Sequence, residues 1–270
     1  MIVVGLETSS TIAGIAVIRD RQVMAEASQE LGGVHAEKLP GMLERIMGDL
    51  GVQWSEVEGF AISIGPGSYT GLRVGLSLVK GLAYVTKRPV AAVPTLDAIA
   101  FQVPCSGYPV HVLTDARRGQ VYEARYDTSG GWPERQTEFR VGPLEDVLAS
   151  IEDKVLLVGS GVDAYHPDIV NMLGERASFP PAGAGRLMAS STAFLGLDRL
   201  KRGEQSDLNT LEPLYLRKTD FARQPPSRLE RTPPADASPS APASAAPGPP
   251  GPSGPPDSPG PPGRAETSSE

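Results

Sequence analysis

Short apolar runs and amphipathic stretches alternate along the first hundred residues. Residues 2–8, 12–18 and 22–28 are apolar or β-branched runs joined by tight polar turns, a pattern typical of an antiparallel meander. Leucine or isoleucine then recurs every three or four residues from about 36 to 50, which predicts an amphipathic helix. The elements expected next are a strand at 60–64, a helix at about 69–86, a strand at 90–93 and a short helix at 95–101.

Pro, Gly and Ser interrupt this pattern near 104–109, and a reduced version of the same order follows. The expected elements are strands near 110–114, 119–127 and 135–141, a helix at 143–151, a strand at 155–158, and helices near 163–173 and 184–202. Two successive units of the order βββαβα predict an α/β protein with two lobes of the actin-like, or ribonuclease H-like, kind. We assign residues 1–104 to an N-terminal lobe and 105–223 to a smaller C-terminal lobe.

The C-terminal residues 224–270 have a different composition from the rest of the chain. They hold 15 of the 27 prolines, and Leu229 is their only large aliphatic residue. Such a segment buries too little apolar surface to offset its ordering entropy. We therefore predict a disordered, Pro-rich tail that takes no part in the fold.

Charge and cysteine content narrow the class of protein. The formal net charge is -7, no apolar run is long enough to cross a bilayer, and the first residues are typical of a buried strand rather than a signal peptide. We expect a soluble, cytoplasmic protein without membrane contact. Cys105 is the only cysteine, so it forms no internal disulfide. Pairs such as Arg117 and Arg118 are interpreted as solvated surface, so any nucleic acid would be reached through a partner.

The most specific segment is IGPGSYTGLR, residues 64–73, which joins an apolar strand to a helix. Gly65 and Gly67 free the backbone, and Ser68 or Thr70 can cap the helix. A helix N-terminus can bind an anion, but the segment lacks the lysine of a phosphate-binding P-loop. A tight structural turn is therefore the favoured interpretation.

Four segments resemble the TsaB (YeaZ) family: GPGSYTGLRVGLSLVKGLA, GLETSSTIAGIAV, HAEKLPGML and TDARRGQVYEARY. The resemblance covers residues 1 to about 220. It implies an actin-like fold and the role of a small, non-catalytic subunit in the bacterial machinery that forms threonylcarbamoyladenosine at adenosine 37 of tRNAs reading ANN codons. The implied partners are the catalytic paralogue TsaD, the ATPase TsaE and the synthase TsaC, with tRNA contacted only indirectly.

The resemblance also implies that the catalytic metal site is lost. The paralogue carries a His-x-x-x-His motif, and Thr95 and Ile99 stand where the two histidines would be. An isoleucine cannot coordinate a metal ion. The three histidines, His35, His111 and His166, are far apart in sequence and are expected to be exposed or locally hydrogen-bonded. We therefore expect no catalytic residue and no bound metal.

The nucleotide loops of actin-like ATPases are only partly retained. The first loop keeps hydroxyls at Thr8, Ser9 and Ser10 but lacks the glycine that makes room for a phosphate. In the second lobe, Asp115, Gly159 and Gly161 are the remaining candidates. We expect no resident cofactor, and at most weak binding of ATP or ADP at a complex interface.

Two helices of the first lobe are predicted to dock a partner. The helix at 69–86 has one narrow polar stripe, and its other faces are apolar or glycine, which suggests burial on two sides. Gly71 and Gly75 would allow another helix to approach closely. The residues predicted to contact the partner are Leu39, Met42, Leu43, Ile46, Met47, Gly71, Leu72, Gly75, Leu76, Leu78, Val79 and Leu82. The family resemblance points to the same two helices, and without the paralogue the patch would form a homodimer.

Three other functions compete with this interpretation. An actin-like small-molecule kinase would need two intact phosphate loops. A metallopeptidase, or glycoprotease, would need a histidine motif that the sequence lacks. A chaperone-like or regulatory scaffold with no link to tRNA is compatible with the composition.

Overall fold

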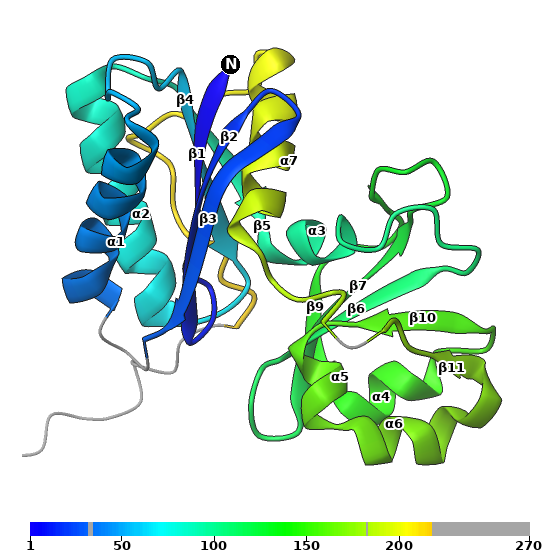
Figure 1. Ribbon diagram of the computed structural model, residues 1–270. Helices are drawn as coiled ribbons and strands as arrows, with labels where there is room; N and C mark the ends of the chain where they lie inside the picture. The colour runs from blue at the N-terminus through cyan, green and yellow to red at the C-terminus, as the bar shows by residue number, and fades with distance from the viewer. Residues whose placement is uncertain (32–34, 182, 218–270) are drawn as a thin grey trace, which may run out of the picture. The chain divides into compact units, whose positions relative to one another are not determined.

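The computed structural model describes residues 1–31, 35–181 and 183–217, and Figure 1 shows the arrangement of their helices and strands. The predicted Pro-rich tail at 224–270 lies outside the described residues. Within the described part of the chain, no helix is both long and apolar enough to span a membrane.

The first sheet has the strand order β3-β2-β1-β4-β5. Its meander consists of β1 (Ile2–Glu7), β2 (Ile12–Arg19) and β3 (Gln22–Glu30), which pair antiparallel as the sequence predicts. The other two strands, β4 (Gly59–Gly65) and β5 (Val90–Pro94), extend the sheet in parallel on the other side of β1. Strand β1 therefore lies at the centre, and all six of its residues are buried.

Helices cover both faces of this sheet (Figure 1). The helices α1 (His35–Leu50) and α2 (Tyr69–Thr86) pack on one face, where Val4 and Leu6 belong to a shared apolar core. The helix α7 (Ala189–Lys201) packs on the other face, against the alternate residue Val3. The alternation of side chains along a strand lets β1 serve both faces.

The position of α7 corrects our assignment of 184–202 to the C-terminal lobe. The helix begins at Ala189 and packs against β1, β2, β4 and β5 of the first sheet. Glycines make this close contact possible: a Cβ at Gly5 would lie 2.7 Å from the Ala193 Cβ, and one at Gly196 would lie 2.2 Å from the Ala61 Cβ. The chain stays with the first sheet afterwards, since the Leu214 amide donates to the Ile64 carbonyl (2.7 Å).

The second sheet repeats the first in reduced form. Its order is β11-β10-β6-β7-β8, with β9 also paired to β7. The strands are β6 (Val110–Asp115), β7 (Gln120–Asp127), β8 (Glu134–Arg135), β9 (Arg140–Pro143), β10 (Val155–Val158) and β11 (Ala177–Ser178). The helices that follow these strands are α4 (Leu144–Ala149), α5 (Ser160–Ala164), α6 (His166–Leu173) and the 3-10 turn η1 (Gly174–Arg176). The single strand predicted at 135–141 is two short strands, β8 and β9.

The directions of pairing are the same in both sheets. Strand β6 pairs antiparallel with β7 and parallel with β10, as β1 does with β2 and β4. The predicted duplicated, actin-like fold is therefore confirmed. A short helix, α3 (Thr95–Ala100), contacts both β6 and β7, and the Asp97 carboxylate accepts a hydrogen bond from the Tyr126 hydroxyl (2.8 Å).

Candidate functional site

The glycine-rich turn before α2 is filled by protein atoms. The Ser68 amide donates to the Ser9 carbonyl (2.6 Å), and the Ser68 side chain accepts from the Gly71 amide (3.2 Å) as the helix cap. A Cβ at Gly67 would lie 2.2 Å from the Ser9 carbonyl oxygen. The glycine is needed because another loop of the protein touches the turn, so the favoured structural interpretation is correct.

Gly71 and Gly75 do not face an open surface. A Cβ at Gly71 would lie 2.1 Å from the Thr8 carbonyl oxygen, and one at Gly75 would lie 2.2 Å from the Thr8 Oγ1. The two glycines let α2 pass directly over the end of β1. Their predicted role in admitting a second helix is therefore wrong, and the close approach is to Thr8.

Most of the residues predicted to contact a partner lie inside the first lobe. Nine of the twelve are buried in the described structure: Leu39, Leu43, Ile46, Met47, Gly71, Leu72, Gly75, Leu76 and Val79. The other three, Met42, Leu78 and Leu82, are half-buried and lie at the margin of the same core. Periodicity identified the apolar faces of α1 and α2 correctly but could not tell which apolar residues the sheet covers.

A partly exposed apolar face remains on α2, and we call it the α2 face. It consists of Val74, Leu78, Leu82 and Val85, which are spaced by four, four and three residues and so share one side of the helix. Val85 is 78% exposed, and the other three residues are half-buried. Methyl groups added at Gly81 on α2, or at Gly41 and Gly48 on α1, would meet open space. Of the α2 face, Leu78 and Leu82 belong to the residues that the sequence predicts for docking, whereas Val74 and Val85 do not.

A buried carboxyl group lies at the end of β1. Glu7 is 2% exposed, and one of its carboxylate oxygens accepts from the Ser9 amide (2.6 Å). Burial raises the pKa of Glu7 above its ordinary value of 4.5, although the hydrogen bond from Ser9 opposes the shift. The other carboxylate oxygen and the Thr8 hydroxyl have no partner within the described residues.

The second-lobe candidates gather at one end of β6. The Asp115 carboxylate accepts from the Tyr165 hydroxyl (2.8 Å) and the Arg117 amide (2.7 Å). Cβ atoms at Gly159 and Gly161 would lie 2.5 and 3.0 Å from the Leu113 carbonyl oxygen. Both glycines therefore serve the packing of α5 on β6. Within the described residues, no hydrogen bond joins this group to Thr8, Ser9 or Ser10.

These residues do not fit the phosphates of a nucleotide in the way that the fold family implies. The Ser68 amide, a donor that an anion at the start of α2 would need, is already used by the Ser9 carbonyl. Thr8 and Ser9 are buried, and only Ser10 is partly exposed. The first loop is closed by its own protein contacts.

The positions that would carry metal ligands belong to the core. The Thr95 hydroxyl lies 2.8 Å from the Ser63 hydroxyl, and Ile99 is 2% exposed in an apolar cluster with Val110 and Val112. Among the residues that the structure describes, no three His, Cys, Asp or Glu side chains are arranged to hold a metal ion. The expectation of a metal-free protein stays a prediction.

The histidines differ from expectation at one position. His111 is 7% exposed, and its Nδ1 has no partner in the described part of the chain. Burial, together with the charges of Arg125 and Arg140, lowers the pKa of His111 to about 4. The expectation of an exposed or locally hydrogen-bonded side chain is wrong here. His166 is exposed and stacks on Phe179 at 4.7 Å, and the side chain of His35 lies outside the described ones.

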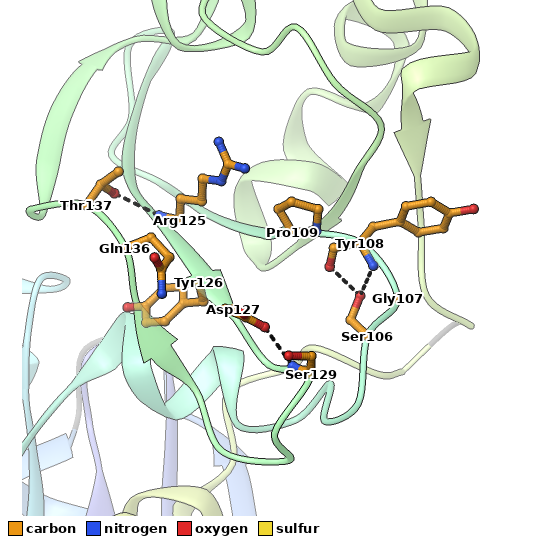
Figure 2. Close-up of a pocket in the computed structure, with 10 residues that line it drawn as sticks. All are labelled: Ser106, Gly107, Tyr108, Pro109, Arg125, Tyr126, Asp127, Ser129, Gln136 and Thr137. Carbon is orange, nitrogen blue, oxygen red and sulfur yellow. Dashed lines mark hydrogen bonds between the residues drawn. The ribbon is translucent and has the colours of Figure 1, made fainter.

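A shallow pocket of about 460 Å³ lies on the second lobe (Figure 2). Most of its polar groups are used by neighbouring loop atoms. The Ser106 hydroxyl donates to the Tyr108 carbonyl, the Thr137 hydroxyl accepts from the Arg125 amide, and the Asp127 carboxylate accepts from the Ser129 amide. None of the residues predicted for docking or nucleotide binding lines this pocket.

Known proteins resemble this chain over most of the described residues. The family described as "TsaD: tRNA N6-adenosine threonylcarbamoyltransferase" matches residues 23–150. The Bacillus subtilis tRNA threonylcarbamoyladenosine biosynthesis protein TsaB is 30% identical over 220 residues, which are 80% of this chain and 94% of that protein. The Escherichia coli TsaB is 26% identical over 80% of this chain and 95% of its own length.

A solved structure extends the similarity to the fold. It is a Pseudomonas aeruginosa protein described as similar to the peptidase YEAZ, with a TM-score of 0.67 and 25% sequence identity. The match covers 80% of this chain and 99% of that one.

Proposed function

The chain belongs to the TsaB family, and we propose that it acts in tRNA threonylcarbamoyladenosine biosynthesis as a non-catalytic subunit that docks onto the catalytic paralogue TsaD. The family membership supports the pathway. The observation that carries the docking role is the partly exposed α2 face, in which Val85 is 78% exposed at the end of an 18-residue helix. Modification of adenosine 37 in tRNAs reading ANN codons would then take place on the paralogue.

The spacing of the α2 face suits a helical partner. Val74, Leu78, Leu82 and Val85 form an apolar stripe along the helix. Fully burying an exposed side chain such as Val85 stabilises by roughly 1.5–3 kcal/mol, and the three half-buried side chains would add less. Gly81 and the α1 glycines Gly41 and Gly48 offer positions where a second pair of helices could approach closely. We propose a four-helix contact between the two paralogues at this place.

A non-catalytic role agrees with what fills the metal-ligand positions. Thr95 is hydrogen-bonded to Ser63, and Ile99 is packed in the core. We propose that the subunit has no metal or cofactor of its own, and that any ATP or ADP binds weakly at the complex interface. We further propose that TsaE joins this complex, that TsaC supplies the activated intermediate, that the proteins meet in the cytoplasm, and that the subunit self-associates when the paralogue is missing.

The test is a charge placed on the α2 face. Val85→Glu adds a carboxylate to an exposed position, so the isolated subunit should stay folded. In the complex this carboxylate would be buried without a partner, which costs at least several kcal/mol. Ser77→Glu is the matched control, because it adds the same charge on the polar side of the same helix.

Size-exclusion chromatography with the paralogue measures docking, and a reconstituted tRNA modification assay measures function. Val85→Glu should abolish both, while Ser77→Glu should leave both near the wild-type level. Normal docking and modification by the folded Val85→Glu protein would refute the proposed interface.

A further inference from the structure

The last described segment, 211–217, connects the two sheets. The Leu214 amide donates to the Ile64 carbonyl of β4 (2.7 Å). Three residues later, Arg217 donates from Nη2 to the Ala116 carbonyl (3.1 Å) and to the Gln120 side chain. The segment thus runs from the start of α2 to the turn between β6 and β7.

At the α2 end, an arginine contacts two tyrosines that also contact each other. The Arg73 guanidinium lies 3.9 Å from the centre of the Tyr69 ring, and its Nε donates to the Tyr215 hydroxyl (3.0 Å). The two rings lie 5.3 Å apart. Arg73 and Tyr215 are exposed, so this group presents flat aromatic and guanidinium surfaces beside one another.

At the other end, two arginines occupy a turn that favours other residues. Arg117 and Arg118 have φ angles of 64° and 56°, and Gly119 follows at 71°. This left-handed conformation suits Gly or Asn and costs other residues about 1–2 kcal/mol each. Both arginines are exposed. The backbone conformation of the turn therefore does not explain why both positions are arginine. Backbone strain of this kind often marks a functional position.

In the described part of the chain, these four arginine charges have no neutralising carboxylate. Within the described residues, Arg73, Arg117, Arg118 and Arg217 form no ion pair, whereas Arg140, Arg199 and Arg202 each do. The nearest carboxylate in the turn, Asp115, accepts from a backbone amide and from the Tyr165 hydroxyl instead. In a chain with a net charge of -7, this local excess of positive charge is unusual.

We propose that these six residues, Tyr69, Arg73, Arg117, Arg118, Tyr215 and Arg217, form a strip that binds RNA. Guanidinium groups bind phosphate oxygens in bidentate geometry, and unstacked bases stack on tyrosine and arginine planes. The contacts from Arg73 through Tyr215 to Arg217 and the turn make the strip continuous. The subunit would then contact RNA itself, contrary to the expectation from its sequence that Arg117 and Arg118 are simply solvated.

The choice of tRNA as the probe rests on the proposed function. Binding of a fluorescently labelled tRNA to the full chain is measured by anisotropy at about 50 and about 200 mM salt, since phosphate contacts make affinity fall with salt. The test variant is Arg117→Asn with Arg118→Gly, which removes two charges and relaxes the turn. The matched control is Arg19→Gln with Arg21→Gln. It also removes two exposed arginine charges, which lie at the C-terminal end of β2 and in the turn after it, outside the strip.

The test variant should bind tRNA at least about ten-fold more weakly at the lower salt, and the slope of log affinity against log salt should shrink by roughly 1.4–1.8. Its unfolding midpoint should be equal to or higher than that of the wild type, because the new residues suit the turn. The control should stay within about two-fold of wild-type affinity. Tyr215→Leu should weaken binding without changing the salt slope, because it removes stacking and no charge.

Three results would overturn the proposal. The first is no tRNA binding by the wild type at about 50 mM salt, and the second is an equal loss of tRNA affinity in the test variant and the control. The third is a test variant that no longer docks to the paralogue but binds tRNA as tightly as the wild type. The last result would assign the strip to an acidic protein surface. Docking is measured separately by size-exclusion chromatography. If the wild type binds tRNA through the strip but does not dock, the proposed function fails while the RNA-binding strip stands.

Discussion

Two Gly→Ala exchanges in helix α2 are expected to change stability in opposite directions. Gly81 faces open space, whereas a Cβ at Gly71 would lie 2.1 Å from the Thr8 carbonyl oxygen. Alanine is a better helix former than glycine by up to about 1 kcal/mol. Gly81→Ala should therefore stabilise the protein, and Gly71→Ala should destabilise it.

The magnitude at Gly71 follows from what the new methyl group meets. The nearest atom belongs to the backbone at the end of β1, where all neighbouring residues are buried, so it cannot move aside as a flexible side chain would. Overpacking of this kind costs typically about 1–3 kcal/mol. After a gain in helix propensity of about 1 kcal/mol is subtracted, Gly71→Ala should lose up to roughly 2 kcal/mol, while Gly81→Ala should gain up to about 1 kcal/mol.

Urea unfolding followed by circular dichroism measures both changes. For a protein of this size, each kcal/mol corresponds to roughly 2–4 °C in the thermal midpoint. The two variants should therefore lie on opposite sides of the wild type, several degrees apart. A Gly71→Ala protein as stable as Gly81→Ala would show that Thr8 yields easily, and the packing reason for this glycine would be wrong.

Four further outcomes are expected. Because the folded protein holds a proton on Glu7 above pH 4.5, its stability should fall as pH rises through the raised pKa, and Glu7→Gln should flatten the curve of unfolding free energy against pH in this window. The pKa of His111 is lowered to about 4, so its contribution to stability, at most on the order of 3 kcal/mol, should be lost as pH falls from 6.5 to 4, and His111→Leu should remove that loss. Elemental analysis of the purified chain should find no stoichiometric metal, since Thr95 and Ile99 are core residues, and one tightly held ion per chain would contradict this. Deleting 224–270 should leave the thermal midpoint and docking unchanged, and a drop of several degrees would disprove the prediction.

The sequence predicted the duplicated fold because most strands and helices are marked by a local pattern of apolar residues. Strand β1 and helix α2 are long, apolar and bounded by turn residues, so their limits could be predicted within two residues. The position of α7 against the first sheet could not be predicted in this way, because the strands that it contacts are far from it in the sequence. Small residues on α7 pack against small residues of the first sheet, as Gly196 does against Ala61. The sequence of α7 alone does not indicate which strand its small residues will contact.

The candidate site was predicted less well for a similar reason. A glycine in a helix indicates close packing but not the group that packs against it. Gly71 and Gly75 meet Thr8, whereas Gly81, on the same helix, meets open space. The sequence did not predict the arginine strip because its residues are distant in the chain, with Arg73 and Arg217 more than a hundred positions apart. Only the folded chain brings them together.

Helix α2 carries both proposed surfaces, and its geometry makes them separable. Successive helical residues are rotated by about 100°, so Arg73 and Val74 point in clearly different directions although they are neighbours in sequence. The α2 face ends at Val85, at the C-terminal end of the helix, whereas Arg73 lies near the N-terminus and joins segment 211–217. If both proposals hold, Val85→Glu removes docking but leaves tRNA affinity unchanged, and the turn variant does the reverse. Simultaneous loss of both activities in one folded variant would mean that a single surface binds both partners, and the division argued from the contacts of α2 would be wrong.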